Sequence, residues 1–111
     1  MSKFDEVLAN YADDAKKHGI STALLTGVAK GLGPSIYNAD SSKVSGSDQA
    51  ELDRVRENFL KKKLGLSNSD AELDKAIAET VEAYGKSNPS KHRAVFYAIL
   101  AKKFGKEGQF A

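Results

Sequence analysis

Apolar side chains recur along the first third of the chain at the spacing of an α-helix. They occupy Phe4, Val7, Leu8, Tyr11, Ala12 and Ala15. This spacing puts them on one face and predicts a helix that ends at His18-Gly19. Ser21 is suited to cap a second helix, which Gly33-Pro34 would end. Pro34 can then open a short further turn that carries Ile36 and Tyr37.

Two further helices are marked by capping residues. Residues 38–47 are polar, with four serines and an isolated valine, and predict a surface loop. Asp48 with Glu51 predicts the start of a third helix, and Ser69 with Glu72 forms a capping box for a fourth. The expected buried positions are Leu52, Val55, Phe59, Leu60 and Leu64 in the third helix and Leu73, Ala76, Ile77, Val81 and Tyr84 in the fourth.

The last predicted helix differs from the others because it is apolar on more than one face. It should begin at Asn88-Pro89 or Ser90 and end at Gly105. Its apolar residues include Val95, Phe96, Tyr97, Ile99 and Leu100. A helix that is apolar nearly all round is expected to be buried. The sequence therefore predicts one all-α domain over residues 1–111, a compact bundle of about five helices with the C-terminal helix at its centre.

Composition narrows the class of protein. The chain has 41% hydrophobic and 29% charged residues, which is typical of a globular domain, and it has no cysteine. Disulfides, thiolate nucleophiles and cysteine-based metal sites are therefore excluded. The longest apolar run, Ala94 to Ala101, is too short to span a membrane. Residues 1–6 are polar and carry no apolar core of a signal peptide, so we expect a cytoplasmic protein.

Charge is distributed unevenly along the chain. Residues 1–84 hold 11 basic and 14 acidic side chains, a net −3, whereas residues 85–111 hold six and one, a net +5. Basic residues in the first turn of the last helix would oppose its dipole. One hypothesis is a site for a phosphate or another anionic small ligand, formed by the helix start. Its candidate residues are Lys86, Ser90, Lys91, His92 and Arg93.

The interpretation that we favour for this basic segment is internal neutralisation. The fourth helix is acidic, and residues 85–88 are short enough to join it to the fifth as an antiparallel hairpin. Glu79 and Glu82 would then lie near Lys91 and Arg93.

Nucleic-acid binding and catalysis have weaker support. The third and fourth helices have the outline of a helix-turn-helix, but the second of them carries a net −4, so no specific nucleic acid is expected. Asp14 and His18 have a spacing that can bind a metal, although no third ligand is evident. His92 could act as a general base. Gly31-Leu32-Gly33 lacks the preceding strand of a dinucleotide site. We predict no catalytic residue, metal site or cofactor.

Several segments together resemble a family of short bacterial proteins that is catalogued only as a domain of unknown function. They are residues 31–38, 51–60, 62–66, 93–97 and 102–104. The resemblance covers most of the chain and implies a compact helical protein in the bacterial cytoplasm. It supplies no activity, cofactor or site residue.

Three functions from different classes remain open. The favoured one is a non-enzymatic interaction or binding module, with a homodimer or another protein as partner, because the last helix has apolar residues to spare and Phe110 follows it. The second is the anion binder described above. The third is a small enzyme that uses His92 or the Asp14 and His18 pair.

Overall fold

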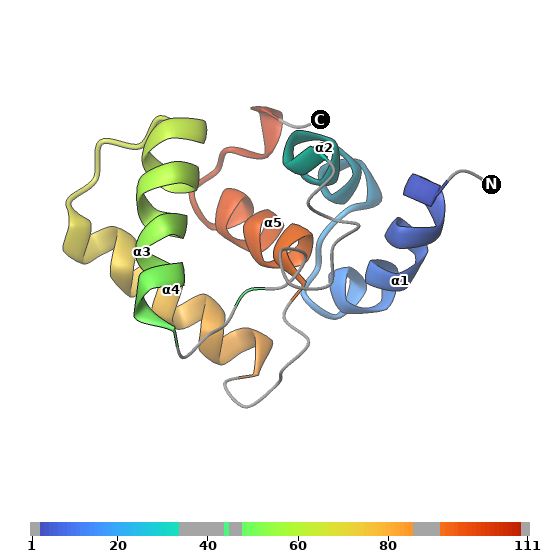
Figure 1. Ribbon diagram of the computed structural model, residues 1–111, viewed down its shortest axis with the longest axis horizontal. Helices are drawn as coiled ribbons and strands as arrows, with labels where there is room; N and C mark the ends of the chain where they lie inside the picture. Colours follow the sequence, from blue (N-terminus) through green and yellow to red (C-terminus); the bar gives the residue numbers. More distant parts are fainter. Residues whose placement is uncertain (1–2, 34–43, 45–47, 86–91, 110–111) are drawn as a thin grey trace.

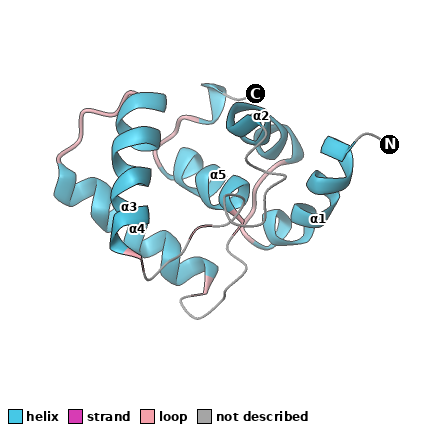
Figure 2. Cartoon of the chain, in the orientation of Figure 1, coloured by secondary structure: helices cyan, strands magenta, loops and turns pink. Residues whose placement is uncertain are grey.

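The chain is mainly helical in the part that its computed structural model describes, namely residues 3–33, 44, 48–85 and 92–109. No strand occurs in these residues, so the predicted all-α fold is confirmed (Figure 2). In chain order the elements are α1 (Lys3–Lys17), α2 (Thr22–Leu32), α3 (Gln49–Arg54), the π-helix η2 (Val55–Lys63), α4 (Asp70–Tyr84), α5 (Arg93–Lys103) and the 3-10 turn η3 (Glu107–Gln109).

Helix α5 is the centre of the fold, as its sequence predicts. Figure 1 shows it with α3 and α4 on one side and α1 and α2 on the other. Val95, Phe96 and Leu100 are fully buried, and α5 packs against α1, α2 and α4. Its apolar residues therefore serve the core of a single chain.

The predicted capping residues begin their helices. Ser21 Oγ accepts a hydrogen bond from Leu24 N–H (3.2 Å), and Asp48 Oδ1 accepts one from Ala50 N–H (3.0 Å). Ser69 and Glu72 form one half of the predicted capping box: Ser69 Oγ accepts from Glu72 N–H (3.3 Å), while the Ser69 hydroxyl donates to Glu72 Oε1 (3.2 Å). The three bonds from backbone N–H groups satisfy donors that the first turn of each helix leaves open.

The third predicted helix differs in type from the prediction. It starts at Gln49 as an α-helix but continues from Val55 as a π-helix of nine residues. The N–H of Leu64 donates to the carbonyl of Phe59 (2.9 Å), five residues back. Helices of this type are rare, usually span a single turn and often occur at functional sites. The length of η2 therefore marks its surroundings as a candidate functional region.

Ion pairs join η2 to α4. Arg56 Nη1 lies 3.0 Å from Asp74 Oδ1, and Lys61 Nζ lies 2.6 Å from Asp70 Oδ1. The hydrogen bond from Lys61 lowers the pKa of Asp70. The stabilisation that the pair of Lys61 and Asp70 contributes is therefore present at neutral pH and is lost as the pH falls through the folded-state pKa of Asp70.

Two other predictions need correction. The valine of the predicted surface loop, Val44, is buried at 2% exposure. Ile36, Tyr37 and the rest of residues 34–43 lie outside the described residues.

Helix α5 begins at Arg93, because His92 has an extended backbone (φ −62°, ψ 127°) and precedes the first turn. The predicted start of this helix at Asn88-Pro89 or Ser90, which would have put His92 inside the helix, is therefore wrong, and Lys91 lies outside the described residues.

Candidate functional site

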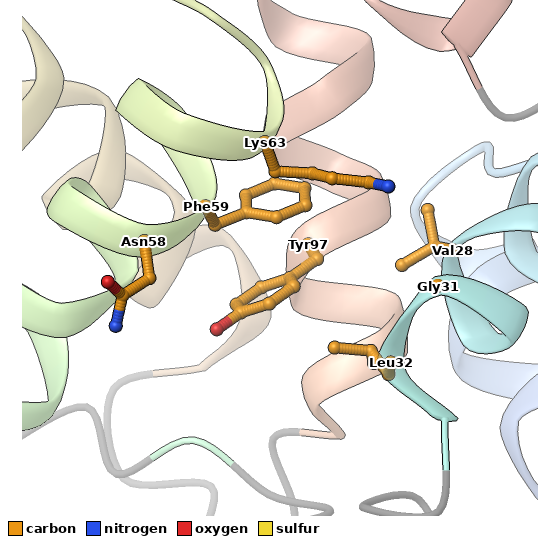
Figure 3. A pocket seen from close by; sticks show the side chains of 7 residues that line it. All are labelled: Val28, Gly31, Leu32, Asn58, Phe59, Lys63 and Tyr97. Atoms are coloured by element: carbon orange, nitrogen blue, oxygen red, sulfur yellow. The ribbon is translucent and has the colours of Figure 1, made fainter.

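A pocket of about 260 Å³ opens between α2, η2 and α5. The last turns of α2 contribute Val28, Gly31 and Leu32, which share one helix face because they lie three and four residues apart. Figure 3 shows these residues opposite the side chains from η2 and α5. Those side chains are Asn58, Phe59 and Lys63 from η2 and Tyr97 from α5.

Two aromatic rings form the floor of this pocket. Phe59 and Tyr97 stack with ring centroids 4.1 Å apart and planes inclined by 22° (Figure 3). Both side chains are buried, at 5% and 7% exposure. Contacts between aromatic rings are favourable beyond the area that they bury. The π-helix thus places a rigid ring against the central helix.

Arg93 holds the ring of Tyr97 in place. Arg93 Nη1 donates to Tyr97 Oη (2.9 Å), and the guanidinium lies 5.6 Å from the ring centroid. Both residues lie on α5 four positions apart, so they meet on one face. The tyrosine hydroxyl is therefore held by the protein, and the ring presents an apolar surface to the pocket.

A carboxylate from α3 neutralises Arg93. Arg93 Nη2 bonds Glu51 Oε1, and the two side chains are 15% and 14% exposed. Glu51 also lies 3.2 Å from Arg54 Nη2. Burial alone would lower the pKa of Arg93, but its contacts with Tyr97 and Glu51 outweigh burial and raise that pKa above its ordinary value. The arginine is thus a charged structural link between α3 and α5.

We expect Tyr97 to make stability fall at alkaline pH. Burial raises the pKa of Tyr97, and Arg93 offsets only part of this rise. Below the ordinary tyrosine pKa of about 10, the preference of the fold for the neutral phenol is fully present; it is lost as the pH rises through the folded-state pKa. Urea unfolding at about pH 8 and about pH 10.5 should show a smaller decline for Tyr97→Phe than for the wild type. Equal declines would contradict this assignment.

Lys63 crosses the rim of the pocket from η2 toward α2. A Cβ atom built on Gly31 would lie 3.9 Å from both Lys63 Cε and Lys63 Nζ, so the lysine runs directly over this glycine. Figure 3 shows the ammonium on the α2 side of the two rings. None of the described residues that line the pocket is acidic. The site therefore combines apolar walls with a cation at its edge.

The predicted anion site is only partly described. Lys86, Ser90 and Lys91 lie outside the described residues. Of the other two, Arg93 is bound to Glu51 and Tyr97. The backbone N–H of His92 donates to Tyr84 Oη (3.1 Å). The anion site stays a prediction, although Arg93 is already engaged in binding protein groups.

For Arg93, the expected neutralisation by α4 takes a different form, whereas the part of that prediction that concerns Lys91 lies outside the described residues. The carboxylate on Arg93 comes from α3, and Glu79, one of the two predicted partners, lies 3.8 Å from Lys103 Nζ. The acidic helix α4 therefore pairs with a lysine in the last turn of α5.

Both histidines of the chain lie against tyrosine rings. The ring of His92 is 4.5 Å from that of Tyr11, and the ring of His18 is 5.0 Å from that of Tyr84. The side chain of Asp14, the other member of the predicted metal pair, lies outside the described residues. Within the described part of the chain, no group of three or more potential ligands could hold a metal ion.

A second hollow, of about 380 Å³, lies between α1 and α2. Leu8, Ala12 and Leu25 are among its walls, together with hydroxyls such as that of Ser21. The described residues that line it include no aromatic side chain. This hollow is therefore a suitable comparison site for binding experiments.

The sequence alone does not predict this pocket, although one residue that lines it, Gly31, is unusual for a helix. The sequence pattern indicates only a helix stop at Gly31, yet a glycine within a helix costs stability compared with alanine and so marks a position where a larger side chain could be excluded. Tyr97 and Phe59 were assigned to the core, where they do lie. What brings Lys63 over Gly31 is tertiary packing, because 32 positions separate the two residues in the chain.

Comparison with known proteins places the chain in a family. A family described as "Protein of unknown function (DUF2853)" matches residues 9–108. The chain belongs to this family. The DUF2853 match confirms the resemblance inferred from the sequence, and it extends over all the residues that line the pocket. No match was found among curated proteins. In the described part of the chain, no helix has both the length and the apolar character needed to cross a membrane.

Proposed function

We propose that this DUF2853 protein is a non-enzymatic binding module whose ligand site is the pocket between α2, η2 and α5. The observation that carries the proposal is the stacked pair of Phe59 and Tyr97 beneath an opening lined by Val28 and Leu32. Small-molecule sites in proteins are concave and mostly apolar, with a few polar groups that orient the ligand. Here Asn58 and Lys63 are those polar groups.

The chemistry of the lining favours binding over catalysis. A nucleophile needs an adjacent base, and general acid–base catalysis needs a titratable group aimed at the ligand. The described lining residues offer an amide, an ammonium and a phenol, and the phenol is bonded to Arg93. These groups suit orientation of a bound molecule.

The other predicted properties remain part of the proposal. A cytoplasmic location and a bacterial origin stay predictions, as does a homodimer. The apolar residues of α5 no longer support a dimer, since they are buried within one chain. Phe110 lies outside the described residues.

Substitutions at Gly31 test the proposed site. A methyl group there would lie at ordinary contact distance from Lys63, so Gly31→Ala should fold and gain about 0.5–1 kcal/mol of stability, as expected for alanine replacing glycine within a helix. Gly31→Leu should extend into the opening and fill it. In a screen of small aromatic and aliphatic fragments by NMR, pocket ligands should bind the wild type and Gly31→Ala alike. They should lose about tenfold or more in affinity, or ~1.4 kcal/mol, in Gly31→Leu.

The matched alanine variant separates blocking of the pocket from general disturbance of α2. Thermal unfolding checks that both variants fold. Fragments that bind all three proteins equally, or the absence of any pocket ligand at millimolar concentration, would overturn the proposal.

A further inference from the structure

We infer that the pocket accepts a small aromatic carboxylate, with its ring against the Phe59 and Tyr97 pair and its carboxylate at the ammonium of Lys63. This assignment of ligand class rests on the proposed function. It is carried by three features of the site: its dimensions, the charge at its rim and its position at the carboxyl ends of two helices.

The dimensions suit one ring with a small substituent. A closed apolar cavity of about 150 Å³ is enough to hold benzene in another protein. The pocket here measures about 260 Å³, so it has room for a six-membered ring and a polar group. Val28 and Leu32 lie across from the aromatic pair, so a flat ligand would contact apolar groups on both sides (Figure 3).

The charge at the rim is positive. Lys63 lies at the opening, and its ammonium carries three N–H donors, so a carboxylate can bind it beside its contacts within the protein. Lys30 and Lys62 are exposed near the ends of the same two helices.

The helix ends limit how much negative charge the ligand can carry. Gly31 and Leu32 lie in the last turn of α2, and Lys63 is the last residue of η2. A helix carboxyl end acts roughly as −0.5 of an elementary charge, so the two ends cancel about one of the lysine charges. Phosphate dianions are often bound at helix amino ends or by arginine forks, and the described lining of this pocket contains neither. Because both helix carboxyl ends disfavour added negative charge, the site favours a monoanion such as a carboxylate over a dianion.

Three ligands of the same shape test the assignment. Benzoate, benzamide and benzamidine differ in charge but share a planar ring and a planar substituent. We expect amide-shift titrations of the wild type to give benzoate the highest affinity, about three- to fivefold above benzamide, as for a partly exposed ion pair. Benzamidine should bind most weakly. Added salt should weaken benzoate more than benzamide.

Lys63→Met provides the decisive variant, because methionine keeps an unbranched apolar stem and removes the charge. It should abolish the preference for benzoate over benzamide. Lys62→Met removes a neighbouring exposed charge that does not line the pocket and should retain the preference.

The outcomes separate this inference from the proposal on which it rests. If benzamide binds as tightly as benzoate, or if Lys63→Met keeps the preference, the carboxylate assignment is wrong while the pocket remains a binding site. If none of the three binds but other fragments are blocked by Gly31→Leu, again only the ligand class is wrong. If no fragment binds there at all, both are overturned.

Discussion

Replacing Phe96 with alanine is expected to lower the free energy of unfolding by about 3–5 kcal/mol, the usual cost of deleting a fully buried phenylalanine. Phe96 has no exposed surface and lies in the middle of α5, which packs against α1, α2 and α4. The loss would remove both buried apolar area and contacts that the surrounding helices cannot restore. Since domains of this size are stable by about 5–15 kcal/mol, the variant should be close to unfolding.

Chemical denaturation of wild type and variant measures this effect directly. Ile99→Ala, on the same helix but at a partly buried position, is the matched control and should cost about half as much or less. A Phe96→Ala variant no less stable than Ile99→Ala would contradict the central placement of α5.

Replacing Glu51 with glutamine is expected to cost about 2–3 kcal/mol. Removal of one partner from a buried ion pair typically costs about 3–5 kcal/mol, because the other charge is left without compensation. The pair of Glu51 and Arg93 keeps about one-seventh of its surface exposed, so water can offset part of this loss. Glu57→Gln changes a carboxylate at 47% exposure in the same continuous helix and should have a smaller effect.

A double-mutant cycle isolates the contribution of this ion pair. Arg93→Met should destabilise the protein on its own, and Glu51→Gln should cost much less once Arg93 is methionine. The coupling should exceed about 1 kcal/mol. Because Arg93 also holds Tyr97, Arg93→Met should weaken fragment binding in the pocket as well. Additive effects on stability would show that the ion pair of Glu51 and Arg93 contributes no coupling energy, which would contradict the account.

The fold could be predicted from the sequence where local signals agree. Ser21, Asp48 and Ser69 each cap the helix that their sequence positions indicated. The burial of α5 followed from the number of its apolar faces, and the observed burial confirms it. These features depend on residues within a few positions of one another, which is the range that local patterns report.

The π-helix could not be predicted with the same certainty. Apolar positions Val55, Phe59, Leu60 and Leu64 are separated by steps of four, one and four. This pattern suits a wider turn as well as an ordinary one, and packing against α4 and α5 decides between them. Val44 was missed for a related reason, because one apolar residue among polar ones gives no period.

The candidate site depends on contacts between distant parts of the chain. Glu51 and Arg93 are 42 positions apart, and Phe59 stacks on Tyr97 from another helix. No local spacing relates such residues. Charge counting did single out the start of α5, but it could not show that Arg93 would be engaged by Glu51 and Tyr97 rather than by a ligand.

Intermolecular nuclear Overhauser effects from a bound aromatic fragment test the central claim most directly. If the pocket between α2, η2 and α5 is the binding site, the ring protons of the fragment should give contacts to the rings of Phe59 and Tyr97 and to the methyl groups of Val28 and Leu32. Contacts to Leu8, Ala12 and Leu25 instead would place binding in the hollow between α1 and α2 and would contradict the account.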